Sequence, residues 1–313
     1  MAAPQVPVVA IERANYGPGG NIPKEDAITF ANNLPAFNNW KNKLQTNFGD
    51  QLKSINIMDI FPFGPAKSAK AGFVMANATI SRPRTNNASK TIQPPGFAFI
   101  RGGAVAILPI LHNESGDKFV LTTIQPRVPG GESAYEEIPA GMLDAEESFI
   151  GVAAKEMKEE TTLDVKKEDL FPLSLIYPSI GGCDENIKIF LYQAKMTNIE
   201  IEKLQGIATG NLAENETIHL KIRPYDEFKA ECMRSSESTL NAPVGISDAK
   251  AQVALGMYEL MLQLGKIPNP KNVSGSVSAA FNARNPGKAG GKRHTRKHSH
   301  RRKHSKMTRH SRK

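Results

Sequence analysis

Three glutamates near the middle of the chain are spaced for metal chemistry. Glu156, Glu159 and Glu160 stand at positions i, i+3 and i+4, so a helix would project all three from one face. Like charges placed in this way destabilise a helix by about 0.2–0.5 kcal/mol per pair, and a bound cation would remove that cost. Carboxylate oxygens are the ligands that Mg²⁺ and Mn²⁺ prefer, with a diphosphate completing the shell. The alternative is a solvated acidic face, with Lys155 and Lys158 supplying local ion pairs.

The residues upstream of these glutamates favour the metal-binding interpretation. The stretch "PAGM", residues 139–142, predicts a tight turn whose backbone carbonyls can join the carboxylates as oxygen ligands. Glu147 lies eight residues before Lys155, about two helical turns away and on a similar side.

The run from Gly141 through Glu147 to "KEMKEETTL" resembles the Nudix box, which reads Gly, five residues, Glu, seven residues, Arg-Glu-apolar-any-Glu-Glu-any-Gly-apolar. Two positions differ, because Lys155 replaces the family arginine and Thr162 replaces the closing glycine. Lysine keeps the charge but loses the bidentate fork that braces the first glutamate of the box. Thr162 is β-branched and resists a positive φ, so either the turn differs here or it is strained. Neither change removes a metal ligand, so activity is expected to remain.

The resemblance extends over residues 96–265 and indicates one subgroup of the Nudix family. The segments "IQPRVPGG", "EEIPAGMLD", "GGCDENIKIFLYQAK" and "LQGIATGNLAENETIHLKI" are similar to ADP-sugar diphosphatases, in particular the plant type that acts on ADP-glucose and ADP-ribose. This resemblance implies hydrolysis of the diphosphate of a nucleoside diphosphate sugar, giving AMP and a sugar phosphate.

The resemblance also implies roles for the acidic residues. The metal ligands for Mg²⁺ or Mn²⁺ fall on Glu156, Glu160 and the backbone carbonyl of Ala140, and Glu159 becomes a further ligand or a catalytic residue that orients water. Gly141, with Glu147 and Lys155, would support the site.

The loop "LAENETIHL" resembles the loop that delivers the general base in ADP-ribose hydrolases. The base falls on Glu214 and a further metal ligand on Glu216. The alternative for this segment is a polar hairpin that precedes a strand.

Substrate contacts are expected from three residues near the box. The resemblance places Arg127 against the diphosphate, where a guanidinium suits phosphate oxygens, although such an arginine at a strand end also forms surface ion pairs. Glu137 is expected on the sugar or adenosine side, or else at the surface. Met142 is expected to pack on the substrate, or else in the core.

Two glycines farther along, Gly181 and Gly182, would let the backbone approach the ligand closely. Aligning these glycines places Ile180 where the ADP-ribose group has proline, while Pro178 stands two residues earlier. Which of the two residues replaces that proline stays open at this level, and so does the nucleotide preference.

The elements that must position these residues predict an α+β fold. Helices are expected near residues 24–45, 147–160 and 248–265 from apolar residues at helical spacing. Strands are expected near residues 55–61, 72–82, 97–111, 117–128, 170–177, 187–196 and 216–228. Together with the resemblance, this pattern predicts a Nudix α/β/α sandwich with a mixed sheet over residues 96–265. A smaller β-rich region, residues 1–95, precedes it, and by analogy with the family it is expected to form a homodimer.

The positive net charge of +9 comes from the C-terminal end of the chain. Residues 266–313 hold 15 of the 40 Lys and Arg and no acid, so residues 1–265 carry 25 bases against 31 acids, a net charge of −6. This segment is too polar to form a core, and it is expected to be a disordered tail that binds nucleic acid non-specifically or directs nuclear import. The alternative is a tail that only improves solubility.

The remaining composition excludes several classes of protein. Two cysteines without CxxC spacing predict neither a disulfide framework nor a zinc site. The chain has no apolar run of membrane-spanning length and no secretory signal pattern, so a soluble, intracellular protein is expected, cytoplasmic or nuclear. Two other functions fit the same box: a decapping enzyme for capped RNA that uses the basic tail, and a non-catalytic Nudix binding module.

Overall fold

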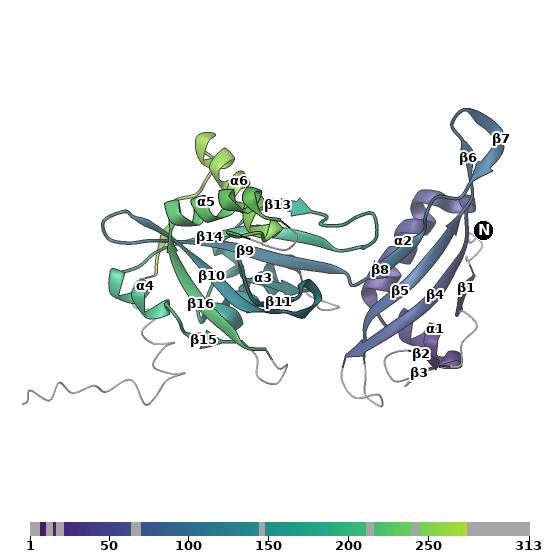
Figure 1. The fold of residues 1–313 in the computed structure, drawn as a ribbon, viewed down its shortest axis with the longest axis horizontal. Coiled ribbons are helices and arrows are strands. Elements are labelled where there is room, and N and C mark those ends of the chain that lie inside the picture. Colours follow the sequence, from purple (N-terminus) through teal and green to yellow (C-terminus); the bar gives the residue numbers. More distant parts are fainter. Residues whose placement is uncertain are drawn as a thin grey trace, which may run out of the picture.

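The computed structural model describes residues 7–10, 15–16, 22–63, 70–143, 148–210, 216–239 and 244–273. Two lobes, each built on its own sheet, are joined where strand β8 ends and strand β9 begins (Figure 1). The sheets therefore change at Arg101 and Gly102, a few residues after the boundary expected near residue 95. No helix within these described ranges is long and apolar enough to span a bilayer.

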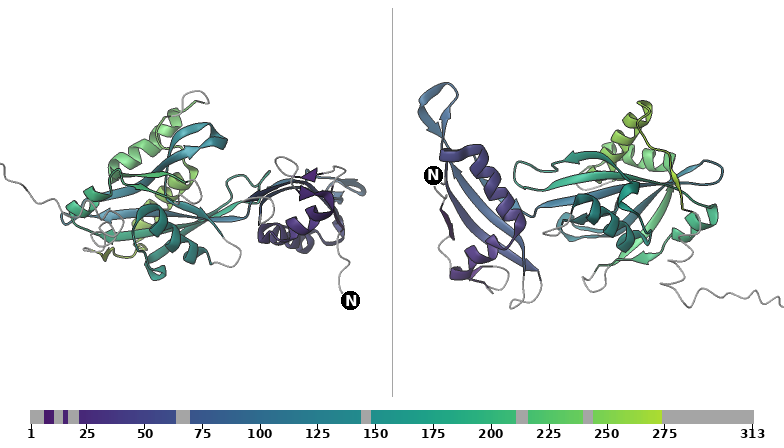
Figure 2. Two further views of the ribbon diagram at one scale, coloured as in Figure 1. Left: turned by 90° about the horizontal axis from the view of Figure 1, so that it is seen from below. Right: turned by 180° about the vertical axis from the view of Figure 1, so that it is seen from behind.

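The smaller lobe is a four-stranded sheet in the order β1-β4-β5-β8 with two helices on one face (Figure 2). Its strands are β1 (Val8–Ala10), β4 (Leu52–Phe63), β5 (Lys70–Ile80) and β8 (Phe97–Ile100), and its helices are α1 (Lys24–Asn32) and α2 (Pro35–Phe48). Two short hairpins accompany it, β2 (Asn15–Tyr16) with β3 (Ile22–Pro23) and β6 (Arg82–Arg84) with β7 (Asn87–Ile92).

The single helix expected over residues 24–45 is two helices. Pro35 stands at the first position of α2, and Leu34 before it is extended, with φ −89° and ψ 114°. Proline disfavours a helical conformation in the preceding residue and suits the first turn of a new helix, so the break follows from the sequence.

The larger lobe is a mixed sheet between two helical layers, which confirms the expected α+β fold class. Its long path runs β13-β14-β9-β10-β16-β15, with β11 on β10, β12 on β9 and β17 on β14. The strands are β9 (Gly103–His112), β10 (Lys118–Arg127), β11 (Glu132–Glu137), β12 (Ala140–Met142), β13 (Leu170–Ile176), β14 (Asn186–Lys195), β15 (Ala208–Thr209), β16 (Ile218–Pro224) and β17 (Lys271–Asn272). The helices are α3 (Phe149–Thr161), α4 (Asn198–Leu204), α5 (Tyr225–Arg234) and α6 (Ala249–Gln263).

Alternation along the central strand β9 separates the two layers of the core. Val105 and Ile107 pack with the cluster that includes α3 and α4, whereas Ala106 and Leu108 pack with the cluster that includes α5 and α6. Successive side chains of a strand point to opposite faces, so β9 is apolar on both sides as a central strand must be. Burying one large aliphatic side chain in this way contributes about 1.5–3 kcal/mol.

Two helices were not anticipated. Residues 216–228 were expected to be a strand throughout, but β16 ends at Pro224 and α5 begins at Tyr225, with Asp226 and Glu227 in its favourable first turn. The short helix α4 is fixed by a capping box between Thr197 and Glu200.

Candidate active site

Glu160 is the buried centre of the acidic face on α3. Its side chain is almost fully buried, with 2% exposure, and its Oε2 accepts a hydrogen bond of 3.0 Å from the backbone N–H of Ala140 on β12. Ser148 begins the helix by accepting a bond of 3.2 Å from the Gly151 N–H, and Met157 is among the buried residues that pack α3 on the sheet. The helix therefore presents one carboxylate directly to the first residue of β12.

Gly141 leaves room for the second carboxylate. A Cβ atom at this position would lie 2.0 Å from the carboxylate carbon of Glu156, a distance that real atoms do not adopt. Only glycine therefore allows the Glu156 side chain to lie against β12, beside Glu160. This contact gives a physical reason for glycine at the first position of the box.

We expect Gly141→Ala to lower kcat/KM by about 100-fold, because it displaces Glu156 by an ångström or more. The unfolding temperature should change little, since the added methyl meets the end of a flexible side chain. Gly256→Ala on α6 is the matched control: a Cβ there has no heavy atom within 4 Å, so activity should be unchanged. Wild-type activity of Gly141→Ala would show that Glu156 need not occupy this position.

The backbone carbonyl of Ala140 faces away from the neighbouring strand. Pro139 accepts a hydrogen bond from the Ile107 N–H (2.9 Å) and Leu143 donates to the Gly103 carbonyl (3.0 Å), so these positions form hydrogen-bonded pairs with β9. Such pairs alternate along an antiparallel ladder, which leaves the Ala140 N–H and carbonyl directed outward. The N–H is taken by Glu160, and the carbonyl remains available as an oxygen ligand.

Burial raises the pKa of the Glu160 carboxyl well above its usual range, and the charges of Glu156 and Glu216 raise it further. The hydrogen bond from Ala140 opposes this shift but does not cancel it. Glu216 therefore belongs to the same electrostatic site, although it lies on a different segment. A bound cation would favour the charged form of all three carboxylates.

The residues on both sides of the segment 211–215, which carries Glu214, lie beside this site. A Cβ atom on Gly210 would meet the Glu216 backbone oxygen at 2.8 Å, so the two ends of the loop are in close contact. Thr209, next to it on β15, donates its hydroxyl to the Glu160 backbone carbonyl and ties the end of α3 to this strand. Glu214 and Glu147 themselves lie outside the described residues, so their predicted roles stay predictions.

Thr162 resolves the alternative left open by the sequence: the turn is strained. It ends α3 with φ 66° and ψ 0°, and it is the only non-glycine residue with positive φ among those described. An L-residue pays for this left-handed conformation with about 1–2 kcal/mol, more when it is β-branched.

We expect Thr162→Gly to raise the free energy of unfolding by about 0.5–1 kcal/mol, because the relieved strain exceeds the greater entropy of glycine in the unfolded chain. Scanning calorimetry on the purified protein measures this shift. Thr162→Val, which keeps the β-branch, should give no gain. Equal behaviour of the two variants would remove backbone strain as the cause.

Two residues expected to bind substrate form an ion pair at the entrance to the turn. Arg127 Nε donates to Glu137 Oε1 at 2.7 Å, and Lys250 Nζ donates to Glu137 Oε2 at 3.0 Å. Glu137 is 2% exposed, so the surface alternative for it is excluded, whereas the Arg127 side chain is 41% exposed and reaches solvent. Lys250 and its neighbour Asp248 were not anticipated from the sequence.

Other predicted residues are placed without a test of their role. Met142 is half-buried on β12 and belongs to none of the core clusters of the described residues, and Lys155 is exposed on α3. Gly181 and Gly182 lie in the β13–β14 loop, where the Gly182 carbonyl accepts from the Phe99 N–H at 2.8 Å. That loop thus contacts β8 of the smaller lobe.

The residues present fit a magnesium or manganese ion. Glu156, Glu160 and the Ala140 carbonyl supply hard oxygen atoms, and Gly141 provides the space that they share. Within the part of the chain that is described, no three acidic, histidine or cysteine side chains form a complete ligand set.

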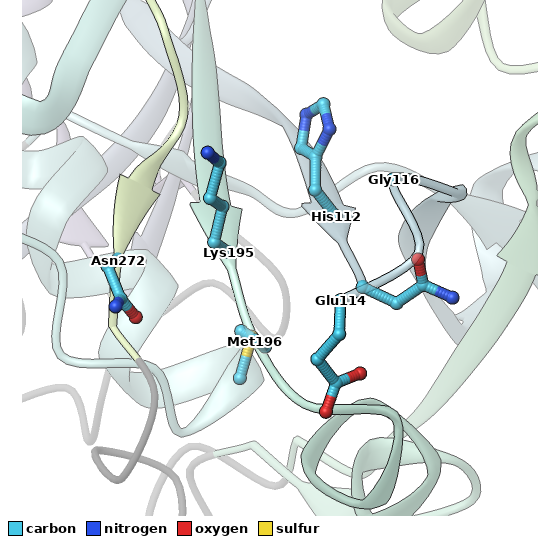
Figure 3. A pocket seen from close by; sticks show the side chains of 7 residues that line it. His112, Glu114, Gly116, Lys195, Met196 and Asn272 are labelled. Atoms are coloured by element: carbon cyan, nitrogen blue, oxygen red, sulfur yellow. The ribbon is translucent and has the colours of Figure 1, made fainter.

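A separate pocket lies at the opposite end of β9, where Figure 3 shows His112, Glu114, Lys195 and Asn272 around it. Glu114 accepts a hydrogen bond from the Asn198 N–H at 2.9 Å, and His112 is hydrogen-bonded to Gln193 at 3.2 Å. These polar groups are satisfied within the protein, and the pocket shares no residue with the acidic site.

Comparisons with known proteins agree with this geometry. The family model described as "NUDIX domain" matches residues 101–240. The chain is 32% identical over 251 residues to Nudix hydrolase 14, chloroplastic, of Arabidopsis thaliana, covering 75% of this chain and 73% of that protein. It is 33% identical over 129 residues to an uncharacterized Nudix hydrolase of Schizosaccharomyces pombe, covering 41% of this chain and 61% of that protein. A solved structure described as an ADP compounds hydrolase matches with 17% identity and a TM-score of 0.42, over 70% of this chain and all of that one.

The two sequence relationships carry the assignment: the chain belongs to the Nudix hydrolase family. It is therefore an enzyme that hydrolyses nucleoside diphosphate derivatives, and enzymes of this family generally use divalent metal ions. The predicted family and the prediction of an enzyme are confirmed, which removes the non-catalytic alternative.

Proposed function

We propose that the protein hydrolyses the diphosphate of an ADP-sugar, ADP-ribose or ADP-glucose, to AMP and a sugar phosphate, using Mg²⁺ or Mn²⁺. The observation that carries this proposal is the burial of Glu160 against the Ala140 turn, with Glu156 and Glu216 near enough to raise its pKa. Bound metal would supply Lewis-acid polarisation of the diphosphate and would acidify water. The sugar preference rests on the resemblance of the segments around the site.

Different residues of the chain bind the metal, accept the proton and orient the water. Glu156, Glu160, Glu216 and the Ala140 carbonyl would hold the metal. Glu214, in the segment between Gly210 and Glu216, takes a proton from the attacking water. Glu159 orients that water.

Binding of the substrate falls to a second group of residues. Arg127, exposed on one side and paired to Glu137 on the other, contacts the diphosphate. Met142, Gly181 and Gly182 line the nucleotide sugar.

A substrate panel tests this function. Product release is measured from ADP-ribose, ADP-glucose and capped RNA, each with Mg²⁺ and each with wild type and Glu160→Gln. Turnover of an ADP-sugar by wild type alone supports the proposal. Turnover of capped RNA alone would replace it with the second candidate.

That second candidate, hydrolysis of capped RNA, is favoured by one observation: the 15 Lys and Arg of residues 266–313, which include no acid. Contacts with phosphates release counterions, so RNA affinity should fall steeply with salt. Deleting residues 274–313 should abolish RNA binding and leave ADP-sugar turnover unchanged. An unchanged RNA affinity after the deletion would exclude a role for the tail in nucleic-acid binding.

A homodimer through the smaller lobe is also proposed. Helices α1 and α2 cover one face of its sheet, and the opposite face carries apolar side chains, including Phe61, Phe73, Met75 and Phe97, the last 44% exposed. A second copy of the chain would bury this face in the manner of related enzymes. Light scattering should give twice the monomer mass, and Phe97→Asp should shift it toward the monomer.

A further inference from the structure

The turn over residues 138–141, here called the catalytic turn, is held by two carboxylates from different helices. The Ile138 N–H donates to Asp248 Oδ2 at 3.2 Å, and the Ala140 N–H donates to Glu160 Oε2 at 3.0 Å. Pro139 between them has no N–H. Both backbone N–H groups of the turn before Gly141 are thus bound to buried carboxylates, since the residues Asp248 and Glu160 are each only 2% exposed.

The start of α6 also contacts Glu137, the residue directly before the turn. Lys250 Nζ donates to Asp248 Oδ1 at 2.7 Å and to Glu137 Oε2 at 3.0 Å, and Glu137 in turn holds Arg127. The carboxylates of Asp248 and Glu137 are each 3% exposed and the Lys250 side chain is 15% exposed. The four charges alternate in sign from Asp248 to Arg127, so each buried charge has an opposite neighbour.

A helix cap alone does not account for this arrangement. Asp248 caps α6 by accepting a hydrogen bond from the Lys250 N–H at 3.2 Å, but asparagine caps a helix about as well as aspartate. Besides the cap, Asp248 Oδ1 accepts from Lys250 Nζ and Oδ2 accepts from the Ile138 N–H, and the amide of asparagine would replace one of these two acceptor oxygens with an NH2 donor. Removing one partner of a buried ion pair leaves the other charge unbalanced, so the pair would rearrange, and Glu137 and Arg127 with it.

Resting on the proposed function, we propose that Asp248 and Lys250 are positioning residues of the active site. Asp248 fixes the catalytic turn, and with it the Ala140 carbonyl, from the side opposite Glu160. Lys250 shares Glu137 with Arg127 and so sets the direction of the guanidinium toward the diphosphate. Neither residue touches the reacting atoms.

The test combines Asp248→Asn, Lys250→Met and the double variant in the full-length chain. Mn²⁺ affinity is measured without substrate, by electron paramagnetic resonance, and kcat and KM are measured with an ADP-sugar. Partners outside the ligand shell typically change metal affinity or activity by 10–100-fold, so Asp248→Asn should weaken Mn²⁺ binding by about 10-fold or more. Lys250→Met should raise KM by about 10-fold with a smaller change in kcat. In the double variant, Mn²⁺ affinity should be little weaker than in Asp248→Asn and KM little higher than in Lys250→Met, because the two residues act as a unit.

Lys229→Met is the control, since Lys229 pairs with Glu259 at 2.9 Å on the same helical layer but has no link to the catalytic turn. It should leave Mn²⁺ affinity, kcat and KM at wild-type values. If Asp248→Asn and Lys250→Met lower only the unfolding temperature, with Mn²⁺ affinity and KM unchanged, the two residues are structural and the inference is wrong. Failure of the wild type itself to bind Mn²⁺ or to hydrolyse any ADP-sugar would instead overturn the proposed function.

Discussion

Glu160→Gln is expected to lower kcat for ADP-sugar hydrolysis by about three orders of magnitude, equivalent to about 4 kcal/mol of lost transition-state stabilisation. The amide keeps an acceptor for the Ala140 N–H, so the turn stays in place, but it removes the negative charge that a divalent cation requires. AMP formation from ADP-ribose at saturating Mg²⁺ measures the loss.

Two further variants make this result specific to the acidic site. Glu202→Gln, on the exposed side of α4, removes the same charge elsewhere and should keep wild-type kcat. Glu159→Gln, half-buried on α3, should reduce kcat less than Glu160→Gln if Glu159 orients water and does not hold metal. A Glu160→Gln enzyme within about 10-fold of the wild-type kcat would contradict the role given to Glu160.

Glu160→Gln should also stabilise the metal-free protein. Because burial and the neighbouring carboxylates raise the folded-state pKa of Glu160 above the ordinary value of 4.5 for a glutamate, the protonated side chain is favoured in the folded state. The contribution of the protonated Glu160 side chain to the free energy of unfolding is fully present below about pH 4.5. It is lost as the pH rises through the folded-state pKa of Glu160. At pH 7.5 with a chelator, Glu160→Gln should therefore be more stable than wild type by about 1 kcal/mol, as is common when a functional site is neutralised.

Calorimetry between pH 4.5 and 8 follows this difference, which should shrink toward the acid end. Tryptophan fluorescence is unsuitable, because the single tryptophan, Trp40, lies on α2 in the smaller lobe. Mg²⁺ should raise the unfolding temperature of wild type but not of Glu160→Gln. A variant that is less stable than wild type at every pH would contradict the pKa assigned to Glu160.

Local patterns in the sequence are sufficient to predict the acidic helix and most strands. The spacing of Glu156, Glu159 and Glu160 predicts one face of one helix, and α3 has that helix from Phe149 to Thr161. For Thr162, which replaces glycine at the end of this helix, the sequence leaves two alternatives, a different turn or a strained one, and the structure has the strained turn with a positive φ. These features depend on residues only a few positions apart.

The features that the sequence did not predict depend on distant partners or on weak local signals. Asp248 and Ile138 are 110 positions apart, and the link between them exists only because α6 packs on the sheet over β9, β13 and β14. Burial of Lys250 and the ion pair of Glu137 are consequences of the same packing. The start of α5 at Tyr225 was missed because an apolar, alternating strand runs directly into it without a glycine or a polar loop.

A titration of the metal-free protein with Mn²⁺ tests the central claim most directly, which is that the acidic face of α3 and the Ala140 turn together chelate a divalent cation. Wild type is expected to take up Mn²⁺, more tightly when a non-hydrolysable ADP-ribose analogue is present, and Glu160→Gln is expected to lose this uptake. Absence of Mn²⁺ uptake by wild type, both with and without the analogue, would contradict the account.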